Sequence, residues 1–210
     1  MADDPTANRR PLASRRLGVM RRLAEALARA RVAPNAISVA GTLFALVAAA
    51  ALVAAGSGWA AGWLLGAVFV QLRLLANLLD GLVAVEGGRG TPTGVLFNEV
   101  PDRVEDAAIL AGFGVAAGWL MLGVWAALAA VGCAYVRQVG GALGQAQSFI
   151  GPMAKQHRMA AVTLGCLIGF AEALAGSGPG LAGLLLWGVL AGTLLTIVRR
   201  LRHVARGLPG

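Results

Sequence analysis

Carboxylate and amide side chains gather in one short stretch of an otherwise apolar chain, between Asn77 and Asp102. The stretch holds four of the ten acidic residues in the sequence, two asparagines and a run of glycines. Residues three, four and seven positions apart share one face of a helix. Two polar stripes are therefore expected, the first formed by Asn77, Asp80, Gly81 and Ala84, and the second by Asn98, Asp102, Glu105 and Asp106.

Two facing helices that present these oxygens would form a site for a hard divalent cation such as Mg²⁺ or Mn²⁺. The glycines between the stripes let a ligand approach the backbone closely. A metal ion and close backbone approach together suit a substrate that contains a pyrophosphate group. The competing interpretation is that these residues only cap helix ends at the membrane interface, with Asn98 as an N-cap and Pro101 in the first turn.

The composition places these residues in a membrane protein. Hydrophobic residues make up 58% of the chain and charged residues 13%, and the mean hydropathy is +0.72. An average soluble domain carries about 25% charged residues. The 210 residues leave room for several spanning helices of about 20 residues each, and no separate soluble domain is expected. Cys133 and Cys166 lie in apolar runs and are expected to pack as small hydrophobic residues.

Six apolar runs predict an all-α integral membrane fold with six transmembrane helices. The predicted spans are Ala36–Ala55, Ala60–Ala84, Asp102–Ala117, Trp119–Val136, Met159–Ala175 and Leu181–Val198. Short glycine-containing turns connect the spans in pairs near residues 58, 118 and 178. Three tryptophans near these turns are expected in the outer aromatic belt: Trp59, Trp63 and Trp119.

Basic residues predict the orientation. Eight of the 18 basic residues precede residue 32 and four follow residue 198, whereas the three turns contain neither Lys nor Arg. By the positive-inside rule, both termini are expected in the cytoplasm, in the cell (inner) membrane, with the polar stretch on the cytoplasmic side. The net charge of +8 is thus assigned to lipid-facing flanks and not to nucleic-acid binding. The first apolar run begins too late for a cleavable signal peptide.

An amphipathic helix is expected on the membrane surface before the first span. Leu17, Met20, Leu23 and Leu27 recur at three- and four-residue intervals among arginines, and Pro34 follows. The predicted organisation is a basic N-terminal segment with this juxtamembrane helix (1–33), a six-helix membrane domain (34–200) and a basic cytoplasmic tail (201–210).

The spacing of the polar stretch resembles the motif of the CDP-alcohol phosphotransferase family. That family carries D-x2-D-G-x2-A-R-x8-G-x3-D-x3-D at the second and third of six membrane helices. This chain reads Asn77-x2-Asp80-Gly81-x2-Ala84-Val85-x8-Gly94-x3-Asn98-x3-Asp102, with every spacing kept. Three positions differ, because Asn77 and Asn98 stand where the motif has aspartates and Val85 stands where it has arginine.

The resemblance implies a metal-dependent membrane enzyme of phospholipid synthesis. Such an enzyme transfers a substituted phosphate group from a CDP-linked donor, such as CDP-diacylglycerol, to an alcohol and releases CMP. By resemblance, Mg²⁺ or Mn²⁺ would be held by Asn77, Asp80, Asn98 and Asp102. Candidates to supply the missing charge are Glu99, Glu105 and Asp106. Asp102 would also be the general base. The family resemblance further implies a homodimer.

Three small residues, Gly81, Ala84 and Gly94, would let the cytidine diphosphate part of the donor approach the backbone. Arg89, in the connecting loop, would replace the missing arginine of the motif. Asparagine offers a neutral oxygen, so binding of two metal ions should be weaker than with four aspartates, and a one-metal site is an equal alternative.

Other cations lie near the same end of the predicted helices. Arg73, inside a span, is expected either to pair with Asp102 or Asp106 or to contact substrate. Three further cations form either an anion site for a phosphate-bearing acceptor or ordinary membrane anchors: Arg137, Lys155 and Arg158.

Two competing functions remain at this point. A catalytically impaired relative would bind nucleotide-lipid or a partner without turnover, and the two asparagines favour it. A small transporter fits less well, because the spans show no evident internal repeat and the polar stretch lies at one end of the helices.

Overall fold

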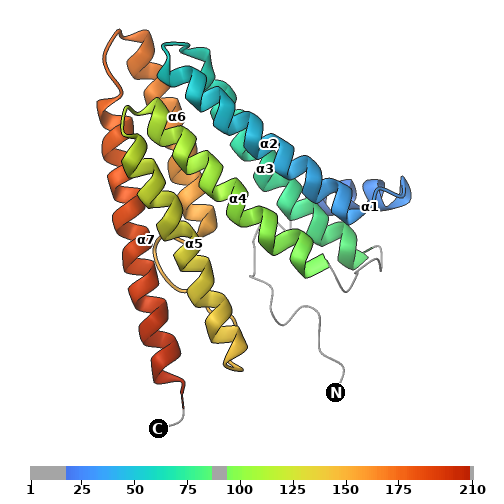
Figure 1. The fold of residues 1–210 in the computed structure, drawn as a ribbon. Coiled ribbons are helices and arrows are strands. Elements are labelled where there is room, and N and C mark those ends of the chain that lie inside the picture. Colours follow the sequence, from blue (N-terminus) through green and yellow to red (C-terminus); the bar gives the residue numbers. More distant parts are fainter. Residues whose placement is uncertain (1–17, 87–93, 209–210) are drawn as a thin grey trace.

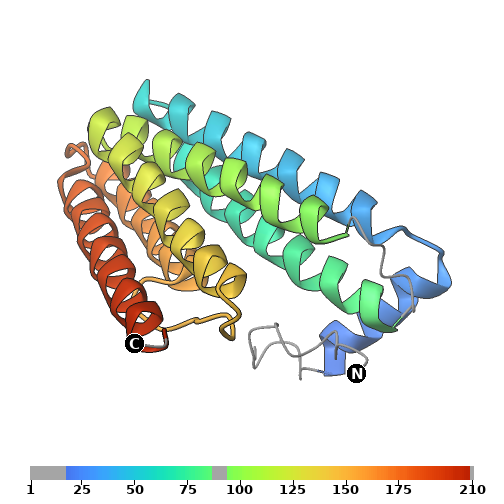
Figure 2. The same cartoon turned by 60° about the horizontal axis from the view of Figure 1, so that its bottom comes forward.

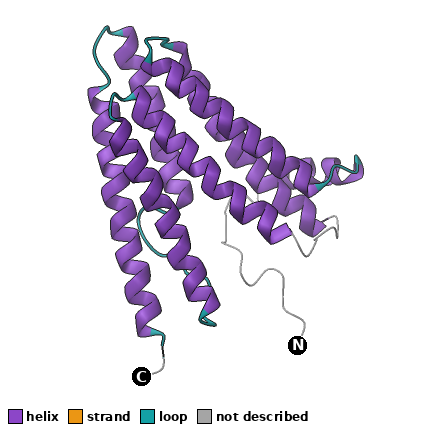
Figure 3. Cartoon of the chain, viewed as in Figure 1, coloured by secondary structure: helices purple, strands orange, loops and turns teal. Residues whose placement is uncertain are grey.

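Seven helices make up the described part of the chain, residues 18–86 and 94–208, in this computed structural model (Figure 3). They are α1 (Gly18–Arg29), α2 (Pro34–Gly56), α3 (Ala61–Glu86), α4 (Gly94–Ala116), α5 (Leu120–Ala142), α6 (Lys155–Leu174) and α7 (Gly180–Arg206). The predicted all-helical fold is confirmed over these residues.

The helices α2 to α7 run back and forth between two ends of the molecule (Figures 1 and 2). The short turns at 57–60, 117–119 and 175–179 lie at one end, which we call the turn end. The α5–α6 connection, α1 and the last turn of α7 lie at the opposite end, which we call the polar end. Toward the polar end, α2, α3 and α4 diverge from α5 and α7.

Among the described residues, five helices are long and apolar enough to cross a membrane, namely α2, α3, α5, α6 and α7. Large apolar side chains also cover the outside of the bundle, and Leu43, Leu128 and Leu184 are each more than half exposed. An apolar exterior with charged groups buried inside is the arrangement of a multi-pass membrane protein. α4 has a similar length but carries five charged residues in its N-terminal half.

The predicted third span began too late along the chain. α4 starts at Gly94, two turns before Asp102, and Pro101 lies inside the helix. A proline removes one backbone hydrogen bond, but the turns on either side keep theirs, so α4 runs through it. Asn98 therefore lies within α4, and its alternative assignment as an N-cap is wrong. α7 is also longer than predicted and continues to Arg206.

The segment predicted to be amphipathic contains a helix from Gly18 on, α1, which packs against α3. Leu17 lies outside the described residues. Ala24 is fully buried in a small cluster with Ala76, Leu79 and Val83. The arginines Arg21 and Arg22 are exposed on its other side. Protein contacts with α3 therefore cover part of the apolar face that the sequence assigned to the membrane surface.

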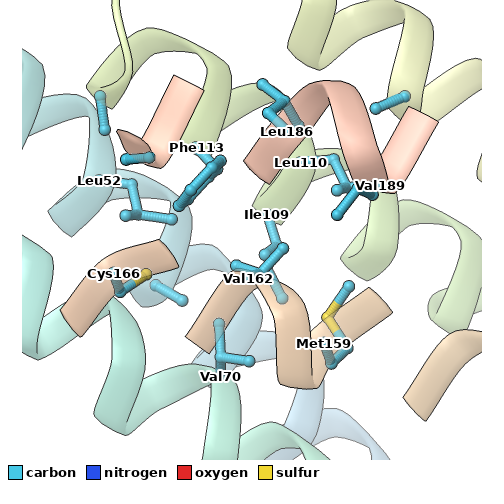
Figure 4. Packing of buried hydrophobic residues seen from close by; sticks show 14 of the residues in the cluster. Leu52, Val70, Ile109, Leu110, Phe113, Met159, Val162, Cys166, Leu186 and Val189 are labelled. Atoms are coloured by element: carbon cyan, nitrogen blue, oxygen red, sulfur yellow. The ribbon is translucent and has the colours of Figure 1, made fainter. Parts of the chain in front are cut away.

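The main core lies toward the turn end and joins side chains from α2 to α7 (Figure 4). Cys166 is part of this core, and Cys133 is buried nearby; both are free thiols within the described residues, as expected. Trp63 is also a core residue, with its ring 5.7 Å from that of Phe113. Its assignment to the outer aromatic belt is wrong, because its side of α3 faces α4 and α6 rather than lipid.

α4 and α5 touch through their backbones at two glycines. A Cβ atom added to Gly114 would lie 2.7 Å from the Cα atom of Gly123, and one added to Gly123 would lie 2.8 Å from the Cα atom of Gly114. Small residues of this kind let membrane helices approach closely. This contact fixes α4, and with it the acidic residues of its polar half.

Candidate functional site

Polar side chains from four helices meet inside the polar end of the bundle. We call this set the polar centre, and it consists of Ser38 and Thr42 on α2, Arg73, Asn77 and Asp80 on α3, Asp102, Glu105 and Asp106 on α4, and Lys155 and Arg158 on α6. Each of these side chains is buried or half-buried. Charged groups at this depth persist because they are paired.

The two halves of the acidic stretch face each other. Asn77 Nδ2 on α3 donates a hydrogen bond to Asp102 Oδ1 on α4, at 2.6 Å. The same carboxylate oxygen is ion-paired with Lys155 Nζ of α6. The prediction that the two stripes meet is confirmed by these contacts, and α6 joins them as a third element.

Arg73 is the most deeply buried cation of the polar centre, with no exposed surface. Its Nε donates to Glu105 Oε2 at 2.5 Å, and its Nη2 donates to Asp106 Oδ1 at 2.8 Å. A longer contact of 3.4 Å joins Nη2 to Asp102 Oδ1. The expected pairing of Arg73 with Asp102 and Asp106 is confirmed, and Glu105 is a further partner that the sequence did not indicate.

Asp106 is bound by two arginines. Oδ1 accepts from Arg73, and Oδ2 accepts from Arg158 Nη2 at 2.8 Å. Arg158 also donates to the carbonyl of Met153, at 3.0 Å, in the α5–α6 connection. Since both oxygens of Asp106 already accept charge-assisted hydrogen bonds, this residue ties α4 to α3 and α6 and offers no unsatisfied oxygen to a metal ion.

Glu99 belongs to a separate cluster between α4 and α5. Its oxygens accept from Arg137 Nη2 at 2.7 and 2.8 Å and from Gln138 Nε2 at 2.9 Å, and Arg103 is also ion-paired with it. Glu99 and Arg137, predicted as a metal ligand and an anion-binding residue, are therefore paired with each other. Asn98 lies one turn before Asp102 on α4 and is half-buried.

Asp80 differs from the other carboxylates. Its Oδ2 accepts a hydrogen bond from Ser38 Oγ at 2.8 Å. Its Oδ1 is buried, and no described residue donates a hydrogen bond to it. A buried carboxylate oxygen without a donor is costly unless another group, such as a cation, satisfies it. Among the residues suggested as metal ligands, Asp80 thus has the clearest oxygen for a divalent cation.

α2 contributes two residues that sequence reasoning missed. Ser38 binds Asp80, and Thr42 Oγ1 donates to Glu105 Oε1 at 2.8 Å. The signal was their spacing, because hydroxyl groups four positions apart on an apolar span share one face of the helix. Backbone carbonyls of α2 lie 3.3 Å from both hydroxyls and are alternative acceptors for the same hydrogen.

The described residues do not form a preassembled metal-binding cluster. Over residues 18–86 and 94–208, no group of three or more His, Cys, Asp or Glu side chains is arranged to hold a metal ion. Gly81 and Ala84 follow Asp80 on α3 and are half-buried, and Gly94 is the first residue of α4. Arg89, the predicted replacement for the motif arginine, lies outside the described residues.

Arg200 of α7 is a third buried arginine among the described residues, and the sequence did not single it out. Its Nε donates to the carbonyl of Ile150 at 3.1 Å, and its Nη1 donates to the carbonyl of Cys133 at 3.0 Å. These bonds link α7 to α5 and to the α5–α6 connection. They hold the segment that leads into Lys155 and Arg158.

The chain resembles known proteins in sequence and in structure. No family model matches it. Part of the chain is 39% identical over 92 residues to the phosphatidylinositol phosphate synthase of Mycolicibacterium smegmatis, covering 44% of this chain and 39% of that protein. The corresponding protein of Mycobacteroides abscessus is 36% identical over 99 residues, covering 46% and 43%. The matched segment thus spans about two fifths of each relative's length.

Solved structures match nearly the whole chain. The phosphatidylinositol phosphate synthase of Mycobacterium tuberculosis in complex with manganese and citrate has a TM-score of 0.74 at 22% identity, covering 91% of this chain and 90% of that one. The same protein with CDP-DAG bound has a TM-score of 0.71 at 22% identity, covering 89% and 93%. This chain has their fold.

Proposed function

We propose that this chain is a membrane enzyme of phospholipid synthesis. It transfers a substituted phosphate group from a CDP-linked donor, CDP-diacylglycerol, to an alcohol acceptor and releases CMP. The similarity to phosphatidylinositol phosphate synthases and the fold shared with a CDP-DAG-bound structure support this activity. The single observation that carries it is the hydrogen bond between Asn77 and Asp102, because it joins the two halves of the motif beside Asp80.

A bound divalent cation, Mg²⁺ or Mn²⁺, would supply neutralisation of the donor's diphosphate. Asp80 would hold this cation through its unsatisfied oxygen, and Asn77 and Asn98 would offer additional neutral oxygens. A solved structure of the same fold contains manganese, which supports the choice of a divalent ion. Asp106 and Glu99, whose oxygens are bound by arginines, act in the proposal by holding the helices that carry the ligands.

Asp102 is the general base of the proposed reaction. It takes the proton from the acceptor hydroxyl, whose oxygen then forms a bond to the phosphorus that carries the lipid. The bond from this phosphorus to the CMP oxygen breaks, and CMP leaves. Lys155 and Asn77 orient the Asp102 carboxylate through their contacts with Oδ1.

The remaining assigned residues bind the two substrates. Gly81, Ala84 and Gly94 let the cytidine diphosphate part of the donor approach α3 and α4, and Arg89 contributes a cation to it. Lys155 is the candidate for contact with a phosphate-bearing acceptor because it is only half-buried. Arg137 and Arg158, proposed for the same anion site, contribute through the carboxylates that they position.

The proposed placement in the membrane includes α4 as a sixth span. α4 has 23 residues, like α2 and α5, and its acidic residues pair inside the bundle rather than facing lipid. Six spans put both termini on one side, and the positive-inside rule assigns that side and the polar centre to the cytoplasmic face of the inner membrane. A homodimer completes the proposed assembly.

The test is an assay of CMP release. Purified protein is incubated with CDP-diacylglycerol, a panel of alcohols that includes inositol phosphate, and Mn²⁺ or Mg²⁺. We expect CMP to appear with at least one acceptor and to disappear in Asp102→Ala. No release above that control, for any donor and acceptor pair, would refute the proposal.

The second candidate is a relative that binds the CDP-linked donor without turnover. The observation in its favour is that Asp102, the proposed base, is already bound by Lys155, Asn77 and Arg73. Binding of CDP-diacylglycerol, measured by its protection against thermal unfolding, together with no CMP release would support this candidate over the enzyme.

A further inference from the structure

The polar centre contains its own cations. Within the described part of the chain it holds four carboxylates, Asp80, Asp102, Glu105 and Asp106, and three basic groups, Arg73, Lys155 and Arg158. One negative charge is therefore left in formal excess. Two divalent cations would add four positive charges, which exceed the single excess negative charge of the polar centre.

The hydrogen bonds show which carboxylates are already satisfied. Asp106 and Glu105 each accept on both oxygens, and three donors converge on Oδ1 of Asp102. Only at Asp80 is a buried carboxylate oxygen left without a donor among the described residues. The buried carboxylate oxygen left for a cation to satisfy therefore lies on α3, at Asp80.

Arg73 of α3 lies against the carboxylates of α4. Its guanidinium contacts Asp102, Glu105 and Asp106, three carboxylates of α4, and it is fully buried. One turn further along the same face of α3, Asn77 also directs an N–H group at Asp102. α3 therefore presents the Arg73 guanidinium to the carboxylates of α4, and its positive charge disfavours a metal ion bound beside it.

We infer that Arg73 is a built-in cation that takes the place of a metal ion between α3 and α4, so that the centre binds a single divalent cation, at Asp80. The inference rests on the function proposed above and specifies its metal requirement. Arg73 is therefore a positioning residue, because its guanidinium contacts the Asp102 carboxylate in place of a metal ion.

The test is the stoichiometry of Mn²⁺ binding to the full-length purified protein without substrate, followed by electron paramagnetic resonance. We expect one Mn²⁺ per chain with the spectrum of an isolated ion. Asp80→Asn should weaken binding by about 10- to 100-fold. The matched control is Glu172→Gln, at the turn end of the bundle, which should leave binding unchanged. Two Mn²⁺ ions per chain with a coupled spectrum, or unchanged binding in Asp80→Asn, would overturn the inference.

Two substitutions of Arg73 test its role directly. Arg73→Gln removes the built-in cation and should admit a second Mn²⁺ ion with a coupled spectrum, whereas Arg73→Lys keeps the charge and should retain one ion. A folded Arg73→Gln protein that still binds one ion would contradict the assignment. If this variant does not fold, the wild-type stoichiometry and Asp80→Asn still decide between one ion and two.

Different results would refute the proposed enzyme function and the inferred role of Arg73. One Mn²⁺ ion per chain without CMP release would leave the metal centre as inferred and refute the enzyme function. CMP release by a protein that binds two Mn²⁺ ions would support the enzyme function and refute the role of Arg73.

Discussion

The two ends of the bundle hold the same helices together by different means. At the turn end, α4 and α5 meet through glycine backbones, and Phe113, Trp63 and Cys166 fill a core without charged groups. At the polar end, α3, α4 and α6 are joined by the ion pairs of Arg73 and Arg158 with Asp106. Lipid is as apolar as the core, so close packing must hold the turn end, while buried charges can join helices only where each has a partner.

The different packing of the two ends explains why the described polar centre lies at the polar end. Packing at the turn end leaves room for backbone contacts and little else. Toward the polar end, α2, α3 and α4 separate from α5 and α7 (Figures 1 and 2). Ion pairs connect helices there, such as Glu99 with Arg137 and Asp106 with Arg158. Close packing at the turn end thus sets the positions of the helices, and the polar end carries their functional groups.

The largest effect is expected from removing the shared carboxylate of the polar end. Asp106→Leu leaves the guanidinium groups of Arg73 and Arg158 without a common partner. Loss of one member of a buried ion pair costs about 3–5 kcal/mol. We expect a strong fall in the thermal unfolding midpoint of the detergent-solubilised protein. A midpoint close to that of wild type would mean that these ion pairs do not hold the polar end together.

A smaller loss is expected at the close contact of the turn end. Gly123→Ala puts a methyl group against Gly114 of α4, and overpacking of this kind costs about 1–3 kcal/mol. Thermal unfolding measures the loss. The matched control is Gly188→Ala on α7, where a Cβ atom would meet no described residue within 4 Å. Equal midpoints for the two variants would show that the glycine contact is not tight.

A third change, at Ser38, should affect Mn²⁺ binding at the polar end while costing little stability. Ser38→Ala removes the hydrogen bond to Asp80 Oδ2, which is worth about 0.5–1.5 kcal/mol. We expect Mn²⁺ binding to weaken by a few-fold because Asp80 loses its orienting partner. Ser57→Ala, which removes an exposed hydroxyl at the turn end, serves as the control. Mn²⁺ affinity that is the same in both variants would argue against Asp80 as the ligand.

The smallest effect is expected from a charge at the turn end. Glu172 of α6 accepts hydrogen bonds from the backbone N–H groups of Leu181 at 2.7 Å and Ala182 at 3.3 Å, in the first turn of α7. Glu172→Gln keeps an acceptor but removes the charge, which is worth about 0.3–1 kcal/mol at a helix N-terminus. The unfolding midpoint should fall slightly and the effect should shrink at high salt. A shift as large as that of Asp106→Leu would contradict the division between the two ends.

The sequence by itself determined the features that depend on local order. Apolar runs located five of the membrane helices within a few residues, except where α5 and α7 continue beyond them. Helical periodicity put Asn77 and Asp80 on one face of α3, and Asp102 and Asp106 on one face of α4. The start of α4 was missed, because a proline and a polar turn resemble a helix end when no packing partner is known.

Tertiary structure decided which of these side chains meet. Periodicity gives the face of a helix but neither its neighbours nor its depth, so the sequence did not separate Glu99, which pairs with Arg137 of α5, from Asp102, which joins α3 and α6. It also left Ser38 and Thr42 of α2 unnoticed, because their four-residue spacing gives a helix face but not the helices that pack against it. The charge balance of the polar centre depends on contacts between residues up to 53 positions apart, as in the pair of Asp102 with Lys155, and only the packed bundle brings them together.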